Sequence, residues 1–524
     1  MRDTDLIADA SVTRVAVREL CEFSARAGDL DVRFGMSPNA REGVAGHLVV
    51  TSRRGADYKS EVTLKSALGD LLISGRADGY DATQNRLEEI KTFRGDLASQ
   101  PANQRQLHWA QLKVYGWLLC TRDALPSITL ALVYFNIDTQ QEFPFEQRVS
   151  SDVLRDYFVE MCGSYSHWAQ QERGHRARRD AYLSSMAFPH KGYRSGQREL
   201  AVAVFRAASA GNSLLVEAPT GIGKSIATLF PMLKAMPLRK LDKVYFLSAK
   251  SSGRRLATDA LAMCANASRA DKSDLPVAEQ SHAVIRVVEL IAKAKACLYP
   301  GKACTGSTCP LAAGFFDRLP VARAAWIKSD ASDARAVTAA ARDHDVCPYY
   351  LAQELVACAD VVVADYNYYF DSSASLYTAM LDREWRVGVL VDEAHNLIER
   401  ARAMYSAELK LSDVDALRRV APDLKRTWTR LIRSWKGLEL SDAESYRVLN
   451  DTPTKFLKAL QKSSEEVGDY LAEHADAAAP LRDFYFAAIH LLRRAETLDE
   501  NSVFRSGSVC QDNKPRELSE TMAG

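Results

Sequence analysis

A phosphate-binding loop and an acidic box are the two sequence features that most constrain the fold of this chain. The loop covers residues 218–225 and reads Ala-Pro-Thr-Gly-Ile-Gly-Lys-Ser, and the box covers residues 392–395 and reads Asp-Glu-Ala-His. Such a loop binds phosphate through backbone N–H groups at the start of a helix, so a helix must follow it. Carboxylates at the carboxyl end of a second strand can then meet the same ligand.

The chain around these motifs alternates short apolar strands with helices. We predict buried strands at residues 213–217, 243–248, 361–364 and 387–391, and a helix over residues 224–236. Repeated β–α alternation favours a parallel sheet with helices on both faces. The predicted fold class is therefore α/β.

The polar side chains of the loop and the box have the chemistry that ATP and Mg²⁺ need. Lys224 would contact the β- and γ-phosphates, and Ser225 would offer its hydroxyl to Mg²⁺. Asp392 would hold Mg²⁺ through water, and Glu393 would orient the attacking water. His395 would couple this site to a neighbouring motor lobe.

Further nucleotide contacts are predicted in the loop and in the segment before it. That segment, residues 188–197, resembles the adenine-contacting segment of superfamily 2 helicases. The resemblance implies that an aromatic ring stacks on the adenine base and that a glutamine reads its edge. These predicted contacts are Thr220, Gly221, Gly223, Phe188, Arg194 and Gln197. The alternatives are an ordinary glycine turn for the loop and an acidic helix N-terminus for the box. The two motifs together favour the nucleotide site.

Four cysteines lie between the loop and the box, at Cys297, Cys304, Cys309 and Cys347. The absence of a Cys-x2-Cys pair weakens a zinc-ribbon interpretation, and four thiolates can also hold a [4Fe–4S] cluster. The spacing alone leaves zinc and iron–sulfur both open.

The first part of the chain predicts a different site. Strands are expected at residues 71–79 and 86–92, a helix at 104–119 and another strand at 127–137. Asp78 ends the first strand and Glu89 lies on the next, so both carboxylates could bind one Mg²⁺ or Mn²⁺ ion.

Three kinds of side chain would complete that site. Lys91 alternates with Glu89 onto the same strand face and could position the attacking water. His47, on a helix, could complete the metal shell. Gln111 and Tyr115 are one helical turn apart and could face a bound nucleic-acid strand.

These motifs support two family resemblances. The loop, the four cysteines, residues 364–368 (Ala-Asp-Tyr-Asn-Tyr) and the box resemble the XPD/DinG-type iron–sulfur helicases of superfamily 2. This resemblance implies a RecA-like lobe, a [4Fe–4S] cluster on the four cysteines, translocation along single-stranded DNA and 5′→3′ polarity. The set around Asp78 resembles the PD-(D/E)xK nuclease fold, most closely its RecB/Cas4-like branch. A nuclease-like domain that only binds DNA is the alternative.

The resemblances divide the chain into domains. We expect a nuclease-like domain (1–165), a linker (166–187), a RecA-like lobe (188–396) with the iron–sulfur insertion (290–350), a helical arch-like domain (397–504) and an irregular tail (505–524). Because 129 residues follow His395, a second RecA-like lobe has no room. The hypothesis is a truncated or frameshifted family member.

Length and composition agree with an ordinary globular protein. The 524 residues are 47% hydrophobic and 26% charged, with a net charge of +1, so a DNA-binding groove would have to be local. We find no signal peptide and no apolar run long enough for a bilayer, so we expect a cytoplasmic protein without membrane contact.

The predicted function is an ATP-dependent DNA helicase coupled to a metal-dependent nuclease, acting on single-stranded or forked DNA in repair or processing. One alternative is a DNA-cleaving protein whose ATPase half is a scaffold. The other is an RNA helicase of the DEAH class, against which the cysteine insertion argues.

Overall fold

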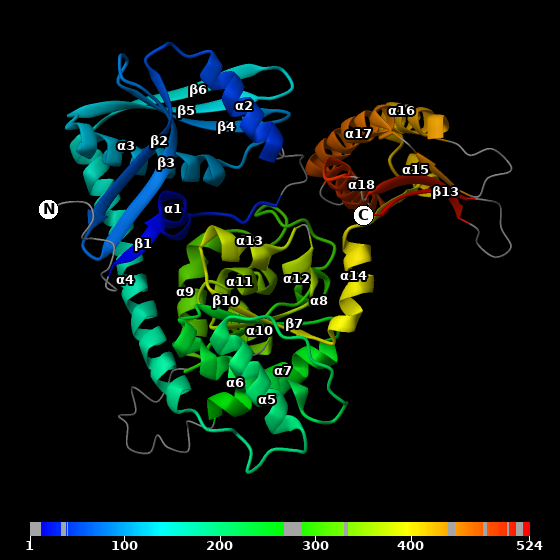
Figure 1. Cartoon of the computed structure of the whole chain (residues 1–524). Coiled ribbons are helices and arrows are strands. Elements are labelled where there is room, and N and C mark those ends of the chain that lie inside the picture. Colours follow the sequence, from blue (N-terminus) through cyan, green and yellow to red (C-terminus); the bar gives the residue numbers. More distant parts are fainter. Residues whose placement is uncertain are drawn as a thin grey trace. The chain divides into compact units, whose positions relative to one another are not determined.

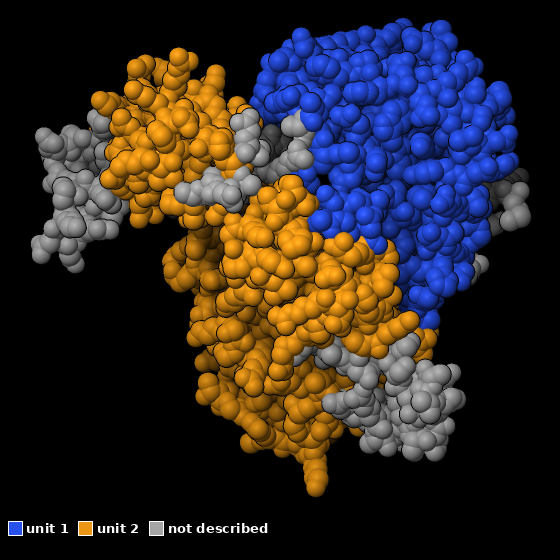
Figure 2. All heavy atoms as spheres, turned by 180° about the vertical axis from the view of Figure 1, so that it is seen from behind, with its two compact units in different colours: residues 1–31, 36–175, 313–317 blue, residues 32–35, 176–312, 318–524 orange. Residues whose placement is uncertain are grey.

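The computed structural model describes most of the chain, and its residues cluster into two compact units (Figure 2). The described residues are 12–32, 38, 40–266, 284–329, 334–371, 373–438, 446–449, 451–474, 479–499, 502–509 and 517–523. Unit 1 comprises Met1–Asp31, Met36–His175 and Ala313–Asp317. Unit 2 comprises Val32–Gly35, Arg176–Ala312 and Arg318–Gly524.

Unit 1 is built on a six-stranded mixed sheet with the order β1-β3-β4-β5-β6, in which β2 also pairs with β3. The strands are β1 (Thr13–Ala16), β2 (Tyr58–Leu68), β3 (Leu71–Asp81), β4 (Arg86–Phe93), β5 (Ser127–Asn136) and β6 (Gln141–Ser150). The pairs β1·β3 and β4·β5 are parallel, and the other pairs are antiparallel. The three strands and the helix predicted in this region are confirmed.

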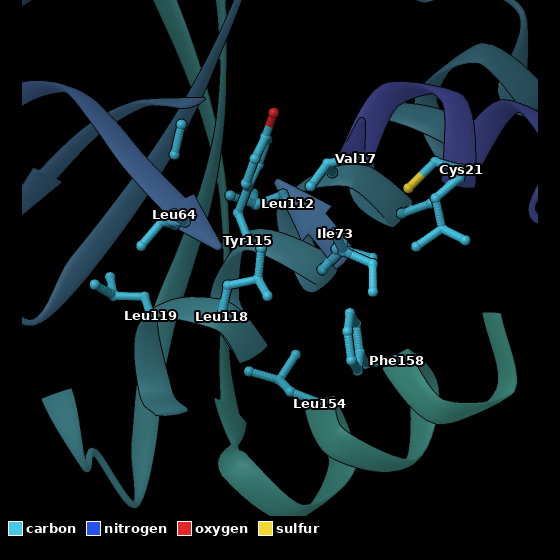
Figure 3. Packing of buried hydrophobic residues seen from close by; sticks show 14 of the residues in the cluster. Val17, Cys21, Leu64, Ile73, Leu112, Tyr115, Leu118, Leu119, Leu154 and Phe158 are labelled. Atoms are coloured by element: carbon cyan, nitrogen blue, oxygen red, sulfur yellow. The ribbon is translucent and has the colours of Figure 1, made fainter. Parts of the chain in front are cut away.

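Helices cover both faces of this sheet because its interior strand β5 is apolar on both sides. The helices are α1 (Val17–Ser24), α2 (Ala40–Ser52), α3 (Ala102–Asp123) and the long α4 (Ser151–Ser185). Alternate residues of β5 enter two separate clusters, with Leu132 on the larger side and Val133 on the smaller. In the larger cluster, Tyr115 and Leu118 of α3 pack between the strands and Phe158 of α4 (Figure 3).

Unit 2 contains a four-stranded sheet that is parallel throughout, with the order β10-β7-β9-β8. Its strands are β7 (Lys243–Ser248), β8 (Val287–Glu289), β9 (Val361–Ala364) and β10 (Val387–Asp392). Every residue of β7 and β9 is buried, as expected for strands with helices on both faces.

Two sets of helices cover the two faces of this parallel sheet (Figure 1). On one face lie α6 (Lys224–Arg239) and α7 (Ser251–Asn266), next to α5 (Gln197–Ala210). On the other lie α11 (Pro348–Leu355), α12 (Asn367–Phe370) and α13 (Ser375–Asp382). The predicted parallel sheet and three of its four predicted strands are confirmed.

The remaining prediction, a strand at residues 213–217, is wrong. These residues form no strand, and the Leu215 side chain is 89% exposed. An apolar run becomes a strand only where a neighbouring strand accepts and donates its backbone hydrogen bonds, and here none pairs with it.

The segment expected as a linker, residues 166–187, is helical as far as Ser185, because it is the second half of α4. Tyr165 and Ala169 of this helix lie in the core of unit 1, whereas Leu183 lies in the core of unit 2. In the charged run at residues 170–179, Arg176 and Arg179 form ion pairs, so this run is an ordered part of the helix and not an irregular linker.

One of those ion pairs predicts a large effect on stability. Arg179 and Asp360 are both buried, their Nη1 and Oδ1 atoms are 2.9 Å apart, and Asp360 also accepts the Arg286 backbone N–H at 2.8 Å. Arg179→Met removes a buried guanidinium that binds this buried carboxylate, so we expect the free energy of unfolding of unit 2 to fall by about 3–5 kcal/mol in urea denaturation.

Arg176→Met is the matched control on the same helix. Arg176 binds Asp242 at 2.7 Å, but its side chain is 42% exposed, so its loss should cost about 0–1 kcal/mol. If both variants lose the same free energy of unfolding, burial of the ion pair is not the cause of the effect of Arg179→Met.

The region after the acidic box combines helices with a second sheet. Its elements are α14 (Leu397–Met404), β11 (Ala407–Lys410), α15 (Leu411–Val420), α16 (Lys425–Trp435), β12 (Tyr446–Leu449), α17 (Thr454–Glu473), α18 (Ala479–Glu496), β13 (Val503–Val509) and β14 (Glu517–Ala523). The strands form an antiparallel sheet, β11-β14-β13-β12.

The prediction of an all-helical region followed by an irregular tail is therefore wrong for the strands. β11 and β12 have four residues each, which is too short for a clear period-two pattern. β11 pairs with β14, more than a hundred residues later in the chain, so no local hairpin signal marks the pairing. No described helix of the chain is long and apolar enough to cross a membrane.

Candidate nucleotide, cysteine and carboxylate sites

The phosphate-binding loop leads directly into α6, as the sequence predicts. Gly221 and Gly223 have φ values of +85° and +82°, a conformation that favours glycine, and Lys224 is the first residue of the helix. The backbone N–H groups of the first helical turn are therefore free of intrahelical acceptors and available to an anion. Ser225 is half-buried in this turn, and Thr220 is exposed before it.

The loop and the acidic box meet although they are 169 residues apart. Nζ of Lys224 lies 2.8 Å from Oε1 of Glu393. β10 is paired with β7 so that Asp392 is opposite Ser248, and the Ser248 hydroxyl donates to Asp392 at 3.3 Å. These side chains lie at the carboxyl ends of adjacent parallel strands, where open α/β sheets bind ligands.

The two carboxylates of the box have different electrostatic environments. The hydrogen bond from Lys224 lowers the pKa of Glu393, so this residue is ionised at neutral pH. Burial, and then the charge of Glu393, raise the pKa of Asp392. A bound cation would favour the ionised form of Asp392.

Of the three residues predicted upstream of the loop, Gln197 and Arg194 contact the loop, whereas Phe188 contacts another aromatic ring. Gln197 is buried, accepts the Arg194 backbone N–H at 3.0 Å and donates to the Gly223 carbonyl at 3.4 Å. The Arg194 guanidinium donates to the Gly221 carbonyl. Phe188 stacks on Tyr193 with ring centroids 4.0 Å apart. One face of the Phe188 ring is thus occupied by another aromatic ring.

His395 is the most exposed predicted residue of the box. Its side chain is 73% exposed, and Nδ1 lies 3.6 Å from Oε2 of Glu393. An exposed imidazole beside the box is accessible to another part of a motor, as its predicted coupling role requires.

The sequence analysis missed Ser248 and a role for Tyr366. Ser248 ends β7 and binds Asp392, and Tyr366 is fully buried with its hydroxyl against the backbone of the box. Ser248 could have been found from its position at the end of a predicted strand, because parallel strands present their carboxyl ends together.

The four predicted cysteine ligands are brought only partly together. Cys297 follows α8 (Lys293–Ala296), and Cys347 precedes α11. Burial raises the pKa of Cys347, and the thiols of Cys304 and Cys297 raise it further, so these three lie in one neighbourhood. Cys309 is buried nearby in sequence. Within the described ranges, no three His, Cys, Asp or Glu side chains are arranged to hold a metal ion.

In unit 1 the strands β3 and β4 separate where the predicted carboxylate site begins. Their ladder pairs Gly79 with Glu88 and runs toward the turn, and beyond it Oδ2 of Asp78 accepts the Ile90 backbone N–H at 2.6 Å. Oε1 of Glu89 accepts from Nζ of Lys91 at 2.6 Å. His47, on α2, has Nδ1 3.6 Å from Oδ1 of Asp78. All four predicted residues therefore lie together.

Burial controls the charges at this carboxylate site. It raises the pKa of Asp78, and it raises the pKa of Glu89 to about 7. Burial by itself would lower the pKa of Lys91, but Glu89 and Asp78 outweigh it and raise that pKa. Burial, followed by the charge of Lys91, lowers the pKa of His47 and favours the neutral imidazole that binds metals.

One oxygen of this site lacks a partner. Oε2 of Glu89 is buried and makes no hydrogen bond with the described residues. An unpaired buried carboxylate oxygen is costly, and a divalent cation is a suitable partner for it. Two carboxylates and an imidazole are residue types that suit such an ion, although in the described residues they are not arranged as a metal-binding group.

Gln111 and Tyr115, expected to face a bound nucleic-acid strand, are both on the inner side of their helix, and their predicted contact with that strand stays a prediction. Both lie on α3 and are buried, and Tyr115 belongs to the hydrophobic core of unit 1. The helical spacing that placed them on one face is correct, but that face is turned to the sheet.

Comparisons with known proteins match part of the chain. Residues 262–414 match the DEAD_2 family model. The chain is 31% identical over 86 residues to the ATP-dependent DNA helicase CHL1 of Candida glabrata, and 36% identical over 69 residues to CHL1 of Saccharomyces cerevisiae. These matches cover 16% and 13% of this chain and only 10% and 8% of those proteins. A solved XPD helicase structure is 16% identical with a TM-score of 0.42, covering 64% of this chain and 55% of that one.

Proposed function

We propose that this chain is an ATP-driven DNA motor similar to the XPD/DinG-type iron–sulfur helicases, joined to a metal-dependent DNA nuclease domain and acting in DNA repair or processing. Its substrate is single-stranded or forked DNA, with 5′→3′ translocation. The observation that carries the proposal is the 2.8 Å contact between Lys224 and Glu393. It joins a phosphate-binding loop to an ionised carboxylate at the end of a parallel strand, as ATP hydrolysis requires. The match to the DEAD_2 model supports the choice of family.

In the proposed reaction, Lys224 transfers its contact from Glu393 to the phosphates of ATP. Glu393 is then released to orient the attacking water. Ser225 and Asp392 would hold Mg²⁺, which neutralises charge that develops on the phosphates. The N–H groups of the first turn of α6 would bind the phosphate oxygens. Arg194 and Gln197 hold the loop in place through the carbonyls of Gly221 and Gly223.

In the proposed nuclease, Asp78, Glu89 and His47 would hold Mg²⁺ or Mn²⁺, which would activate water and neutralise the scissile phosphate. Lys91 would position the water or stabilise charge on the phosphate. The unpaired Oε2 of Glu89 and the separation of β3 from β4 at Asp78 support this assignment. The first feature leaves an acceptor oxygen of Glu89 without a donor, and the second places the Asp78 carboxylate against β4.

The proposed cluster ligands are Cys297, Cys304, Cys309 and Cys347. The thiols of Cys304 and Cys297 lie close enough to Cys347 to raise its pKa, which supports a shared ligand role. Thiolates are the ligands that [4Fe–4S] clusters use, and a bound cluster would tie the segments before α9 (Phe315–Lys328) to the start of α11.

Removal of one proposed ligand should remove iron. We expect the chain purified without oxygen to contain about four iron atoms and the visible absorbance of an iron–sulfur cluster. Cys347→Ser should lose most of both. Cys358→Ala is the control, because Cys358 is buried only eleven residues away but lies outside the proposed set. Zinc without iron in the unaltered chain would refute the cluster.

To test the whole proposal, the protein is incubated with labelled single-stranded and forked DNA and with Mg²⁺ or Mn²⁺, in the presence and in the absence of ATP. ATP turnover that DNA stimulates, together with metal-dependent cleavage, would support it. Cleavage without any ATP turnover would favour the alternative in which the ATPase half is a scaffold.

A further inference from the structure

Tyr366 connects the strand β9 to the acidic box through its hydroxyl group. The residue follows β9 by two positions and is fully buried. Its hydroxyl contacts the backbone carbonyl of Asp392 and lies 3.0 Å from that of Glu393. A phenol in this position donates to the main chain of the box.

Burial also keeps that hydroxyl a donor. It raises the pKa of Tyr366 to about 12, and the nearby carboxylate of Asp392 adds to the shift. Tyr366 therefore stays protonated at any physiological pH, and its one proton can always be shared with these two carbonyls.

The backbone held by this hydroxyl is strained. Glu393 has a φ of +53°, in the left-handed region that residues with a Cβ rarely adopt. Such a conformation costs about 1–3 kcal/mol and persists only where surrounding contacts enforce it. The Glu393 carbonyl also accepts from the Asn396 backbone N–H at 2.9 Å and from its side-chain amide at 3.0 Å.

The strained backbone determines where the carboxylate of Glu393 points. In this conformation the side chain reaches Lys224, with 2.8 Å between Nζ and Oε1. An ordinary right-handed or extended φ would turn the side chain in another direction from the same Cα position. The position of Tyr366 is itself restrained, because the neighbouring Asp365 binds Arg400 at 2.6 Å.

We propose that Tyr366 is a positioning residue for ATP hydrolysis, whose buried hydroxyl holds the main chain of Glu393 in the conformation that aims its carboxylate at the nucleotide site. This inference rests on the ATPase activity proposed above. Tyr366 does not touch the nucleotide, so it acts on the orientation of the water-activating group and not on ATP binding.

The test compares Tyr366→Phe with Tyr368→Phe in the full chain. Phenylalanine keeps the ring and removes only the hydroxyl. Tyr368 is a matched control, since its hydroxyl also donates to a main-chain carbonyl, that of the half-buried Ile291 at 3.0 Å, but not to the box. For Tyr366→Phe we expect kcat for ATP to fall about tenfold, because without this hydrogen bond the Glu393 carboxylate is less well oriented toward the attacking water. The Kd for Mg·ATP, measured by calorimetry, should stay within about twofold.

Each outcome decides between the alternatives. Equal kcat values for both variants and the unaltered chain would overturn the positioning role. A loss of nucleotide affinity parallel to the loss of kcat would also overturn it, because a merely structural role predicts that result. Melting curves identify an unfolded variant, and Lys224→Ala gives the background rate. If the unaltered chain does not exceed that background, the proposed ATPase fails, and the inference fails with it.

Discussion

Lys224→Ala should reduce ATP turnover at least about 100-fold. Removing one preorganised group that stabilises developing charge typically costs this much, and Lys224 is the cation of the loop. The substitution also removes the 2.8 Å contact with Glu393, so the two halves of the site lose their only direct side-chain link among the described residues. Phosphate release from ATP, measured with and without single-stranded DNA, gives the rate.

Two further variants make this result specific. Lys234→Ala changes a lysine on the same helix whose ammonium binds the Ser184 carbonyl at 2.6 Å, away from the loop, and it should keep normal turnover. Glu393→Gln should retain ATP binding but lose hydrolysis, because an amide cannot accept the proton of the water. Unchanged binding and turnover in Lys224→Ala would refute the motor assignment of unit 2.

Asp78→Asn and Glu89→Gln should each abolish metal-dependent DNA cleavage, with losses of at least about 100-fold. Each removes a negative charge from the proposed cation site, and the neutral amides bind Mg²⁺ and Mn²⁺ poorly. Asp78→Asn also alters the carboxylate that accepts the Ile90 backbone N–H. Conversion of end-labelled single-stranded DNA over time, in Mg²⁺ and in Mn²⁺, measures the effect.

Asp81→Asn is the control on the same strand. The Asp81 carboxylate accepts the Gln84 backbone N–H at 3.0 Å in the turn after β3, away from Glu89, so cleavage should persist. Asp78→Asn should leave ATP turnover intact, and Lys224→Ala should leave cleavage intact where ATP is absent. Cleavage that survives both Asp78→Asn and Glu89→Gln would mean that the cutting does not come from this carboxylate site.

The elements predicted well from the sequence are those whose signals are local. The strands at 71–79, 127–137 and 243–248 have apolar runs bounded by turns, and the helix from Lys224 follows a glycine loop. The elements predicted poorly depend on partners far along the chain. The strands β11 and β14 are examples, because neither has an apolar pattern long enough to identify it without the other.

The two candidate sites show the same division. Residue type and spacing identified Lys224, Glu393, Asp78 and Glu89, because phosphate and metal chemistry restrict which side chains can serve. Residue type and spacing could not indicate that Tyr115 is buried in the core. The helical period shows which side chains share one face of the helix, but not which element packs against that face.

The sequence by itself determined the candidate groups of this protein: a phosphate loop, an acidic box, a cysteine group and a pair of carboxylates, each with the ligand class that its side chains suit. Only the tertiary structure decided which of these groups meet. It brings Lys224 to Glu393 across 169 residues and leaves Oε2 of Glu89 unpaired beside Asp78. It also places the Tyr366 hydroxyl under the strained backbone of the box. The physical reason is that hydrogen bonds and burial depend on distances in space, and these arise from strand order and helix packing that no local pattern contains.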